Sequence, residues 1–456
     1  MLQFSRENNR YWMYSMVLLL VAELANGHAT SEAGPLGQRF VLDNGLTVLI
    51  AERPSLPLIT VSGLVNAGSS VEPQGQSGLA NLVAELLTHG TTTRSADQIN
   101  ETIDYIGGSL HSGGNRETAS LSLLVLEKDL EVGLQLLSDV ILNPVFPQEE
   151  ISKKVQEIEA SLQKRKEDPA SLASDLFRES LYGNHWLGRL PDGNEETLKK
   201  ITRQDLIDFH KAFYRPNNTI LSIVGAVKTQ ELLAKLQLIF SSWKKQELPV
   251  RPFSLLQEQG KAVYKTLDRP ITQASIVWGH YGVSRDHPDY YAVEVMNYIL
   301  GGGSLNSRLS LLLREKMGLV YYVYSTFNAG KNAGPFVIHL QTRNEAANEA
   351  IGSILKELKR IQEKEVEPQE LDLAKAYLTG SFPLRMDTNS KIAGLLTSVE
   401  YLGLGLDYPD KYPDLIKAVT AQDVLRVARK CINSEKFVLS VVADQDKADL
   451  HFPQSK

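Results

Sequence analysis

The second half of this chain repeats the first, and the repeat restricts the possible folds more than any other feature of the sequence. Three segments occur twice, in the same order and at nearly the same separation. They are residues 145–149 (VFPQE) and 366–370 (VEPQE), 201–206 (ITRQDL) and 419–424 (VTAQDV), and 221–224 (LSIV) and 439–442 (LSVV). Several matches in one order indicate a duplicated structural unit. A length of 456 residues suits two domains of roughly 200 residues each.

The repeated Thr-x-Gln-Asp pattern predicts the start of a helix in each half. Thr202 and Thr420 can accept a hydrogen bond from the first turn as N-caps. Asp205 and Asp423 follow three residues later, where a negative charge lies near the positive end of the helix dipole. The matching segments therefore agree in local structure as well as in letters.

The two halves have the same order of expected strands and helices. In the first half we expect strands at 39–51 (with a turn at Asn44 and Gly45), 58–67 and 120–126, and a helix at 79–88. In the second half we expect strands at 273–280 and 336–342, and a helix at 290–300. Strands and helices in mixed order favour an α+β fold. We expect two homologous domains, each a mostly antiparallel sheet with helices packed on it, arranged as a clamshell.

The expected boundaries divide the chain into four segments. They are a signal peptide at 1–29, an N-terminal domain at 30–243, a linker at 244–260 and a C-terminal domain at 261–456. The linker contains Pro249 and Pro252 and has no clean hydrophobic period, which is typical of a connection between domains.

The N-terminus has the character of an export signal. Arg6 and Arg10 precede an apolar run at residues 11–22, and small residues suited to cleavage after Gly27 or Ala29 follow it. An uncleaved anchor or a wrongly assigned start is the alternative, but the run is shorter than the ~20 apolar residues that span a bilayer. We expect export without a stable membrane span. A bacterial periplasm suits a chain whose single cysteine, Cys431, allows no internal disulfide.

The composition argues against a nucleic-acid partner. The formal net charge is -6, and the content of 43% hydrophobic and 22% charged residues is that of a folded, soluble protein. Basic residues are scattered, so the sequence shows neither a Lys/Arg-rich patch nor an aromatic stacking platform.

Residues 78–91 (GLANLVAELLTHGT) contain the first motif with chemical meaning. They resemble the active-site helix of the pitrilysin/insulinase family of zinc peptidases, which carries Gly-x-Ala-His-x-x-Glu-His and ends in a Gly-Thr turn. The framing residues Gly78, Ala80, Gly90 and Thr91 all match this pattern.

The positions that the resemblance assigns to zinc chemistry have changed. Asn81 stands at the first zinc-binding His, Ala84 at the catalytic Glu, and Glu85 at the second His. The third ligand, a Glu on a later helix, falls at Ser161 when counted back from Asp168 and the proline after it. The resemblance therefore implies a family member of the non-catalytic type with a degenerate zinc site.

The histidine spacing leads to the same expectation independently of the family. A catalytic zinc needs about three N, O or S ligands, often two His residues one helical turn apart. The nine histidines lie at 28, 89, 111, 185, 210, 280, 287, 339 and 451, so no two are three or four residues apart. Glu85 and His89 share a helical stripe with Asn81 and can touch one metal, but we favour a solvated or hydrogen-bonded polar face. We expect no metal on this chain, since Ala84 also leaves no base to activate water.

A second match to the family lies in the second half. Gly301, Gly302 and Gly303 lead into Ser-Arg-Leu at 307–309, and then into LREKMGLVY at 313–321. In the family an Arg and a Tyr seven residues apart reach across the closed clamshell to the substrate. The resemblance places these roles on Arg314 and Tyr321 and a possible peptide contact on the glycines, which otherwise permit a tight turn.

The chemistry of this pair suits a peptide substrate. A guanidinium can hold a carbonyl or carboxylate through paired hydrogen bonds. A phenol can donate to the oxyanion as the peptide carbon becomes tetrahedral. The alternative is that Arg314 is a helix-surface charge and Tyr321 a sheet aromatic; Tyr322 and Tyr324, on the same strand, are expected to be packing residues.

Three functions follow as hypotheses. The first is an accessory subunit that forms a heterodimer with a zinc-bearing paralogue and presents Arg314 and Tyr321 to the peptide held there. The second is a catalytically inactive scaffold or peptide-binding protein of the same fold. The third, an active zinc enzyme with other ligands, is the least favoured.

Overall fold

The computed structural model describes residues 32–34, 36–250, 256 and 259–452. The predicted signal peptide at 1–29 and part of the predicted linker therefore lie outside the described residues. Across the described ranges, no helix is both long enough and apolar enough to cross a membrane.

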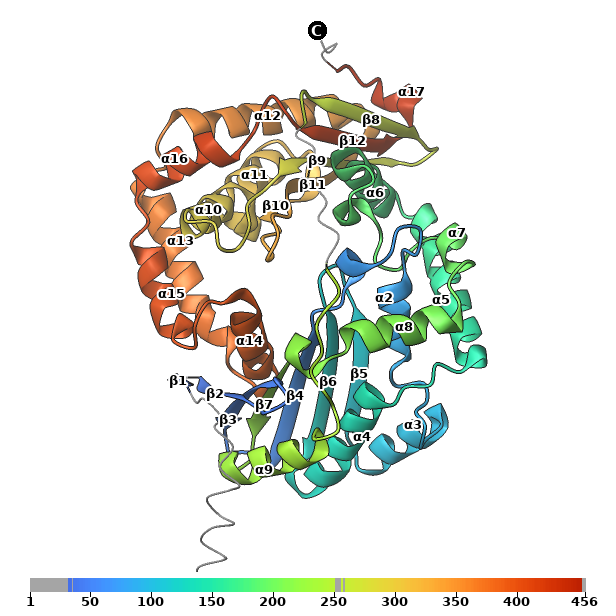
Figure 1. Cartoon of the computed structure of the whole chain (residues 1–456). Helices are drawn as coiled ribbons and strands as arrows, with labels where there is room; N and C mark the ends of the chain where they lie inside the picture. Colours follow the sequence, from blue (N-terminus) through green and yellow to red (C-terminus); the bar gives the residue numbers. More distant parts are fainter. Residues whose placement is uncertain (1–31, 35, 251–255, 257–258, 453–456) are drawn as a thin grey trace, which may run out of the picture.

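Two sheets form the framework, one in each half of the chain (Figure 1). The first has seven described strands in the order β1-β2-β3-β7-β4-β6-β5, and the second has five in the order β10-β11-β9-β12-β8. The strands of the first sheet are β1 Glu32–Gly34, β2 Gly37–Val41, β3 Thr47–Glu52, β4 Leu58–Val65, β5 Ser109–Gly114, β6 Ala119–Leu126 and β7 Thr219–Gly225. Those of the second are β8 Val263–Asp268, β9 Gln273–Tyr281, β10 Val320–Phe327, β11 Pro335–Arg343 and β12 Val438–Ala443.

The two sheets have one topology, which confirms the repeat. Strands β3, β7, β4, β6 and β5 lie in the same order as β8, β12, β9, β11 and β10. In each sheet one pair is parallel, β3 with β7 and β8 with β12, and the remaining pairs are antiparallel. The α+β prediction is thereby confirmed, and the halves lie opposite each other like the shells of a clamshell (Figure 1).

The helices alternate with the strands along the chain, and their order matches between the two halves. The first half contains α2 Leu79–Leu86, α3 Ala96–Tyr105, α4 Leu130–Leu142, α5 Gln148–Glu167, α6 Pro169–Tyr182, α7 Glu195–Leu198, α8 Arg203–Phe213 and α9 Thr229–Ile239. The second contains α10 Tyr290–Asn297, α11 Arg308–Ser310, α12 Ala347–Glu363, α13 Pro368–Ser381, α14 Asn389–Leu402, α15 Tyr408–Lys417, α16 Ala421–Cys431 and α17 Gln445–Ala448. The predicted helix at 290–300 is regular only to Asn297 and continues as a π-helical turn through Gly302.

The predicted caps are present in both halves. The Thr202 hydroxyl accepts a hydrogen bond from the Asp205 backbone, and the Asp205 carboxylate accepts one from the Thr202 backbone at 2.7 Å. Thr420 and Asp423 make the same reciprocal pair at the start of α16. These capping boxes hold two backbone donors per helix, so the repeated letters produce repeated geometry.

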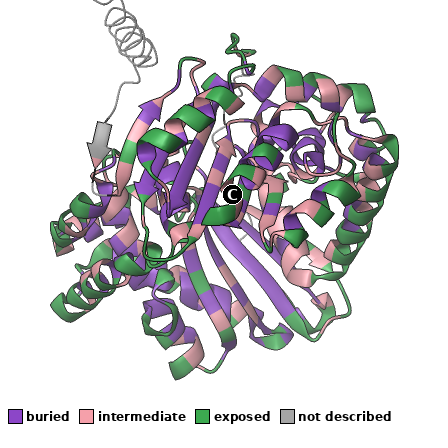
Figure 2. Ribbon diagram, turned by 90° about the horizontal axis from the view of Figure 1, so that it is seen from below, coloured by how far each residue is buried: buried purple, intermediate pink, exposed green. Residues whose placement is uncertain are grey.

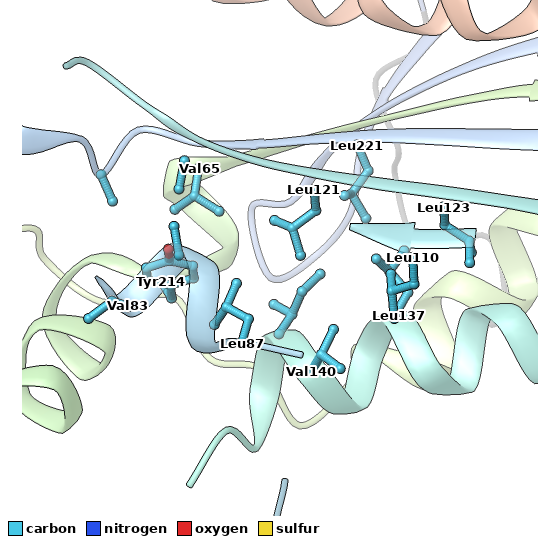
Figure 3. Packing of buried hydrophobic residues seen from close by; sticks show 14 of the residues in the cluster. Val65, Val83, Leu87, Leu110, Leu121, Leu123, Leu137, Val140, Tyr214 and Leu221 are labelled. Carbon is cyan, nitrogen blue, oxygen red and sulfur yellow. The ribbon is translucent and has the colours of Figure 1, made fainter. Parts of the chain in front are cut away.

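Each half has its own core between one face of its sheet and its own helices. Figure 3 shows the first core, where Val83 of α2, Leu87 just after it, and Leu137 and Val140 of α4 pack against the strand residues Leu121 and Leu123. Tyr214, which follows α8, is fully buried in the same core. The second core is built on the same plan from β9, β11 and β12 with α10, α12 and α16. In the view of Figure 2 the sheet strands are mainly buried, while exposed residues lie along the outer helices.

The other face of each sheet is covered by a helix from the opposite half. Helix α6 of the first half packs on β9 and β12 through Ala173, Phe177 and Leu181. Helix α14 of the second half packs on β4 and β7, and its Leu396 lies in a cluster with Leu49 of β3. We call this arrangement the helix exchange.

Polar contacts join the halves at both ends of the helix exchange. The Arg39 guanidinium binds the Glu400 carboxylate at 2.9 Å, and the Thr397 hydroxyl bonds to that of Ser222 at 2.8 Å. On the other side, the Ser440 hydroxyl donates to the Ala173 carbonyl at 2.7 Å. The boundary predicted at 243 and the linker at 244–260 remain predictions, since the exchange links the halves on either side of them.

Candidate functional site

Helix α2 occupies the place of the predicted active-site helix, and its start is fixed by two residues. Gly78 has a φ of 102°, and a Cβ there would lie 2.9 Å from the Asp192 carbonyl, so glycine is required. The Glu72 carboxylate accepts hydrogen bonds from the backbone of Gly78 at 3.0 Å and Ala80 at 2.9 Å. Burial raises the Glu72 pKa to about 8, against the effect of these two hydrogen bonds.

The residues at the degenerate zinc positions are engaged in other contacts. Asn81 is 4% exposed, and its amide nitrogen donates to the Asp192 carboxylate at 3.0 Å. Ala84 is fully buried in the core and offers no ligand atom. Burial raises the Asp192 pKa, and the charge of Glu85 adds to the effect. Asn81 thus packs as part of the polar stripe that the sequence predicted.

Glu85 faces a cation supplied by the protein itself. Its carboxylate lies 3.2 Å from the Lys154 ammonium on α5, which also pairs with Glu157 at 2.7 Å. Ser161, the predicted counterpart of the third ligand, is exposed on the same helix. Among the described residues no three His, Cys, Asp or Glu side chains are placed to hold a metal ion.

These residues do not fit a zinc ion. Ala84 has no metal-binding atom, and the Asn81 side chain is hydrogen-bonded to Asp192. The Glu85 carboxylate is neutralised by the Lys154 ammonium. A tetrahedral zinc site needs three or four converging N, O or S ligands. Sequence reasoning missed Glu72, Asp192 and Lys154, because each approaches α2 from a different part of the chain.

The structure brings Arg314 and Tyr321 together in the second half. The Arg314 guanidinium carbon lies 5.7 Å from the centre of the Tyr321 ring. The Tyr321 side chain is 82% exposed. Arg314 lies in the π-helical segment Leu311–Lys316, and Tyr321 is the second residue of β10, so a short turn connects the two.

A β-bulge accounts for the exposure of Tyr321. The register of β10 on β11 shifts between Val320 and Val323, both of which are buried in the core. The extra residue on the bulged strand turns Tyr321 and Tyr322 away from that core. Bulges commonly re-aim side chains beside functional sites.

The three glycines have a steric role that the structure makes plain. A Cβ at Gly301 would lie 2.4 Å from the Ser325 hydroxyl on β10, and one at Gly303 would lie 2.8 Å from the Tyr298 carbonyl. Gly302 is exposed, but a Cβ there would lie 2.7 Å from the Asn297 amide. The run therefore allows the π-helical turn to pack closely on the strand that carries Tyr321, while peptide contact remains a prediction.

Tyr322 and Tyr324 form part of a cavity as well as a packing layer. Their rings stack 6.2 Å apart, and Tyr324 stacks on His339 at 5.0 Å. Tyr324 is nevertheless 43% exposed. All three residues line a cavity of about 210 Å³ whose opposite wall is formed by residues at the end of α5 and the start of α6. Sequence alternation gave no sign of this cavity, because it depends on the helix exchange.

Comparisons with known proteins agree with this architecture. The model of "Insulinase (Peptidase family M16)" matches residues 47–190, and that of "Peptidase M16 inactive domain" matches residues 200–378. A protein of Rickettsia felis named as an uncharacterized zinc protease is 27% identical over 397 residues, covering 86% of this chain and 94% of that protein. One of Mycobacterium leprae with the same description is 28% identical over 404 residues, covering 87% and 89%.

Solved structures show the same fold. The crystal structure of a peptidase M16 inactive domain from Pseudomonas fluorescens has a TM-score of 0.83 and 27% sequence identity, covering 89% of this chain and 98% of that one. A protease from Helicobacter pylori has a TM-score of 0.81 at 21% identity, covering 91% and 99%. The sheets, the framing residues of α2 and these matches together show that the chain belongs to the insulinase family, peptidase family M16.

Proposed function

We propose that this chain is a non-catalytic subunit of a heteromeric zinc metallopeptidase. The observation that carries the proposal is the contrast between its two sites. Arg314 and Tyr321 lie together, with Tyr321 82% exposed. The degenerate zinc positions on α2 are buried, hydrogen-bonded or paired with Lys154.

The two side chains are suited to act on a bound peptide. The Arg314 guanidinium can donate two parallel hydrogen bonds to a carbonyl or carboxylate. The Tyr321 hydroxyl can donate to the oxygen that becomes negative as the peptide carbon turns tetrahedral, where such a donor stabilises the transition state most. In this proposal the zinc and the general base come from a paralogous subunit, because Asn81, Ala84 and Glu85 are unsuited to supply them.

The N-terminal sequence suggests where this subunit acts. The order of charged, apolar and small residues at the N-terminus is that of a secretory signal peptide. We propose that the pair of subunits acts in a bacterial periplasm, on peptides present there.

Reconstitution tests the proposal. The purified chain should hydrolyse no peptide and should contain no stoichiometric zinc by elemental analysis. Mixed with a paralogue that carries an intact His-x-x-Glu-His, it should give peptidase activity that neither chain has alone. A paralogue that is fully active by itself, or one tightly bound zinc per copy of this chain that Glu85→Ala removes, would contradict the proposal.

A peptide-binding or scaffold role is the alternative, and one observation favours it. The cavity lined by Tyr322, Tyr324 and His339 is built from both halves, and it needs no metal or partner to receive a peptide group. Peptide binding by the isolated chain without any effect on a paralogue's activity would select this alternative.

A further inference from the structure

The cavity between the start of α6 and the second sheet is lined by residues of both halves of the chain. Its volume is about 210 Å³. This is more than the roughly 150 Å³ of an engineered apolar cavity that binds benzene, and less than the about 300–1,000 Å³ of sites for drug-sized ligands. The cavity therefore has room for one side chain of a larger ligand.

The strand register places three rings on the sheet side of this cavity. Tyr324 of β10 lies directly opposite His339 of β11, and Tyr322 precedes Tyr324 by two residues on the same strand. The Tyr322 and Tyr324 ring centres are 6.2 Å apart and those of Tyr324 and His339 are 5.0 Å apart, with both pairs stacked. All three residues line the cavity. We call them the aromatic wall; such a wall favours a further ring, because aromatic rings attract one another in stacked and edge-to-face arrangements.

The aromatic wall keeps capacity for a ligand. Tyr324 is 43% exposed although it stacks on two neighbours. Among the described residues, the side chains of the three wall residues make no hydrogen bond or ion pair. Their contacts within the protein are therefore ring contacts, and their polar atoms stay available to a group in the cavity.

The floor of the cavity contains a buried hydroxyl without a partner. Ser275 of β9 lines the cavity and is 2% exposed, and its Oγ has no hydrogen-bond partner among the described residues. Val277, two residues further along β9, packs in one cluster with Phe177 of α6, so Ser275 lies on the same face of the sheet. A buried polar atom without a partner costs free energy, which a polar group of a ligand recovers.

The charged groups around the cavity are already engaged. The Arg165 guanidinium binds the Asp175 carboxylate through two hydrogen bonds, at 2.7 and 2.5 Å. The Asp168 carboxylate is the N-cap of α6 and accepts a hydrogen bond from the Ser171 backbone at 2.8 Å. Burial is the main cause that lowers the His339 pKa to about 4, so its imidazole is neutral at pH 7. These contacts favour a neutral ligand group with a polar end over an ionised one.

We propose that this cavity binds an aromatic side chain of a peptide, with tyrosine preferred over phenylalanine. The ring of the ligand packs against the aromatic wall, and its hydroxyl supplies the polar group that the Ser275 hydroxyl lacks. Tyr322 directly follows Tyr321, so their Cα atoms are about 3.8 Å apart and a peptide held at Tyr321 lies beside the cavity. The inference rests on the proposed function only in taking a peptide as the ligand, and it requires neither zinc nor cleavage.

Fluorescence anisotropy with the purified chain tests the selection. Four labelled peptides share one sequence of glycine and serine residues and differ at one central position, which is Tyr, Phe, Leu or Arg. The Tyr peptide should bind about tenfold more tightly than the Leu peptide, and the Phe peptide should lie between them. The Arg peptide should bind no more tightly than the Leu peptide. The step from Leu to Phe measures ring packing, and the step from Phe to Tyr measures the hydroxyl.

Variants assign the two steps to named residues. Tyr324→Leu should abolish the preference for Tyr and Phe over Leu and leave the affinity of the Leu peptide unchanged. Tyr105→Leu, on α3, removes a tyrosine that is 92% exposed and should keep the whole preference. Ser275→Ala should remove only the advantage of Tyr over Phe, and its melting temperature should not fall, because the lost hydroxyl has no partner. Tyr322→Phe retains the ring and should bind all four peptides as the wild type does.

Three outcomes overturn the inference. They are equal or absent binding of the four peptides by the wild-type chain, tightest binding of the Arg peptide, and an aromatic preference that Tyr324→Leu retains in full. Selective binding together with a failed reconstitution would remove the proposed subunit role and leave this inference standing. Successful reconstitution without any preference for aromatic peptides would do the reverse.

Discussion

The two halves of this molecule share one strand order but have diverged in opposite ways at their sites. In the first half, two of the degenerate zinc positions on α2 are buried: Asn81 is 4% exposed and Ala84 is fully buried. In the second half, a bulge in β10 turns Tyr321 outward beside Arg314. The same scaffold thus hides one site and presents the other.

Contacts between protein groups surround the degenerate zinc positions on α2. Lys154 supplies a positive charge to Glu85, and Asn81 bonds to Asp192, so contacts within the protein hold α2 in place. Tyr321, by contrast, is 82% exposed, and Arg314 lies beside its ring. Groups kept in an exposed, unpacked position are better explained by a ligand than by stability.

The largest expected effects come from the helix exchange, which treats both halves alike. Phe177→Ala removes a ring that packs on Gly279 of β9, and Leu396→Ala removes the matching contact on the first sheet. In urea denaturation, Phe177→Ala should lower the free energy of unfolding by about 3–5 kcal/mol, and Leu396→Ala should lower it by about 2–5 kcal/mol. Leu384→Ala, at a residue that is 62% exposed, is the control. A loss in only one half would break the symmetry.

The next effect separates the two sites. In the reconstituted enzyme, Tyr321→Phe should lower turnover by about 10²–10³, as the loss of one oxyanion donor does. Tyr322→Phe removes a hydroxyl from the adjacent residue and should leave turnover near that of the wild type. Size-exclusion chromatography should show unchanged assembly for both. Equal activity in the two variants would reduce Tyr321 to a surface aromatic.

A smaller effect is expected in the pH dependence of stability, which Glu72 at the start of α2 should influence. Burial raises the Glu72 pKa to about 8 from an ordinary 4.5. Between these values the folded protein holds a proton that the unfolded chain releases, so stability falls as the pH rises. Glu72→Gln keeps the acceptor for Gly78 and Ala80, and its melting temperature should gain on the wild type from pH 5 to pH 8. Parallel curves would show that Glu72 is not the cause.

A carboxylate at the start of the matching helix in the second half should behave in the opposite sense, with the smallest effect. Asp289, the N-cap of α10, binds Arg426 at 2.7 Å and Lys430 at 2.9 Å, and the Lys430 contact is the main cause that lowers its pKa. Its stabilisation is present above its ordinary pKa of 3.8 and is lost as the pH falls through the lowered value. Asp289→Asn should cost about 0.2–1 kcal/mol at pH 7. The difference in melting temperature should shrink as the pH falls below 3.8.

Much of the framework was predictable because it is local or repeated. The Thr202 and Thr420 caps, the turn at Gly45 with a φ of 87°, and most strand positions follow from residue type and period. The doubled order of elements was enough to predict two sheets of one kind. Hydrophobic alternation cannot, however, say which sheet a helix will cover, so the exchange of α6 and α14 was not foreseen.

The site was predictable in its residues but not in its surroundings. The motif placed Arg314 near Tyr321, and the structure holds them together. Two partners of α2, Lys154 and Asp192, were missed because they come from distant segments of the chain. Glu72 lies only six residues before Gly78, but no spacing rule assigned it a role.

The helix exchange also sets the order in which the two sheet faces become covered during synthesis. During synthesis all strands of the first sheet emerge early. Its face at Leu49, Ala51 and Val224 stays exposed to solvent until α14, residues 389–402, has been synthesised. The second sheet is synthesised after α6, so the helix that covers it is already present. The nascent first half therefore carries an exposed apolar face for the time needed to make about 160 further residues, roughly 10–30 s at ordinary rates of synthesis. Among the two sheets, only the first is completed before the helix that covers its outer face.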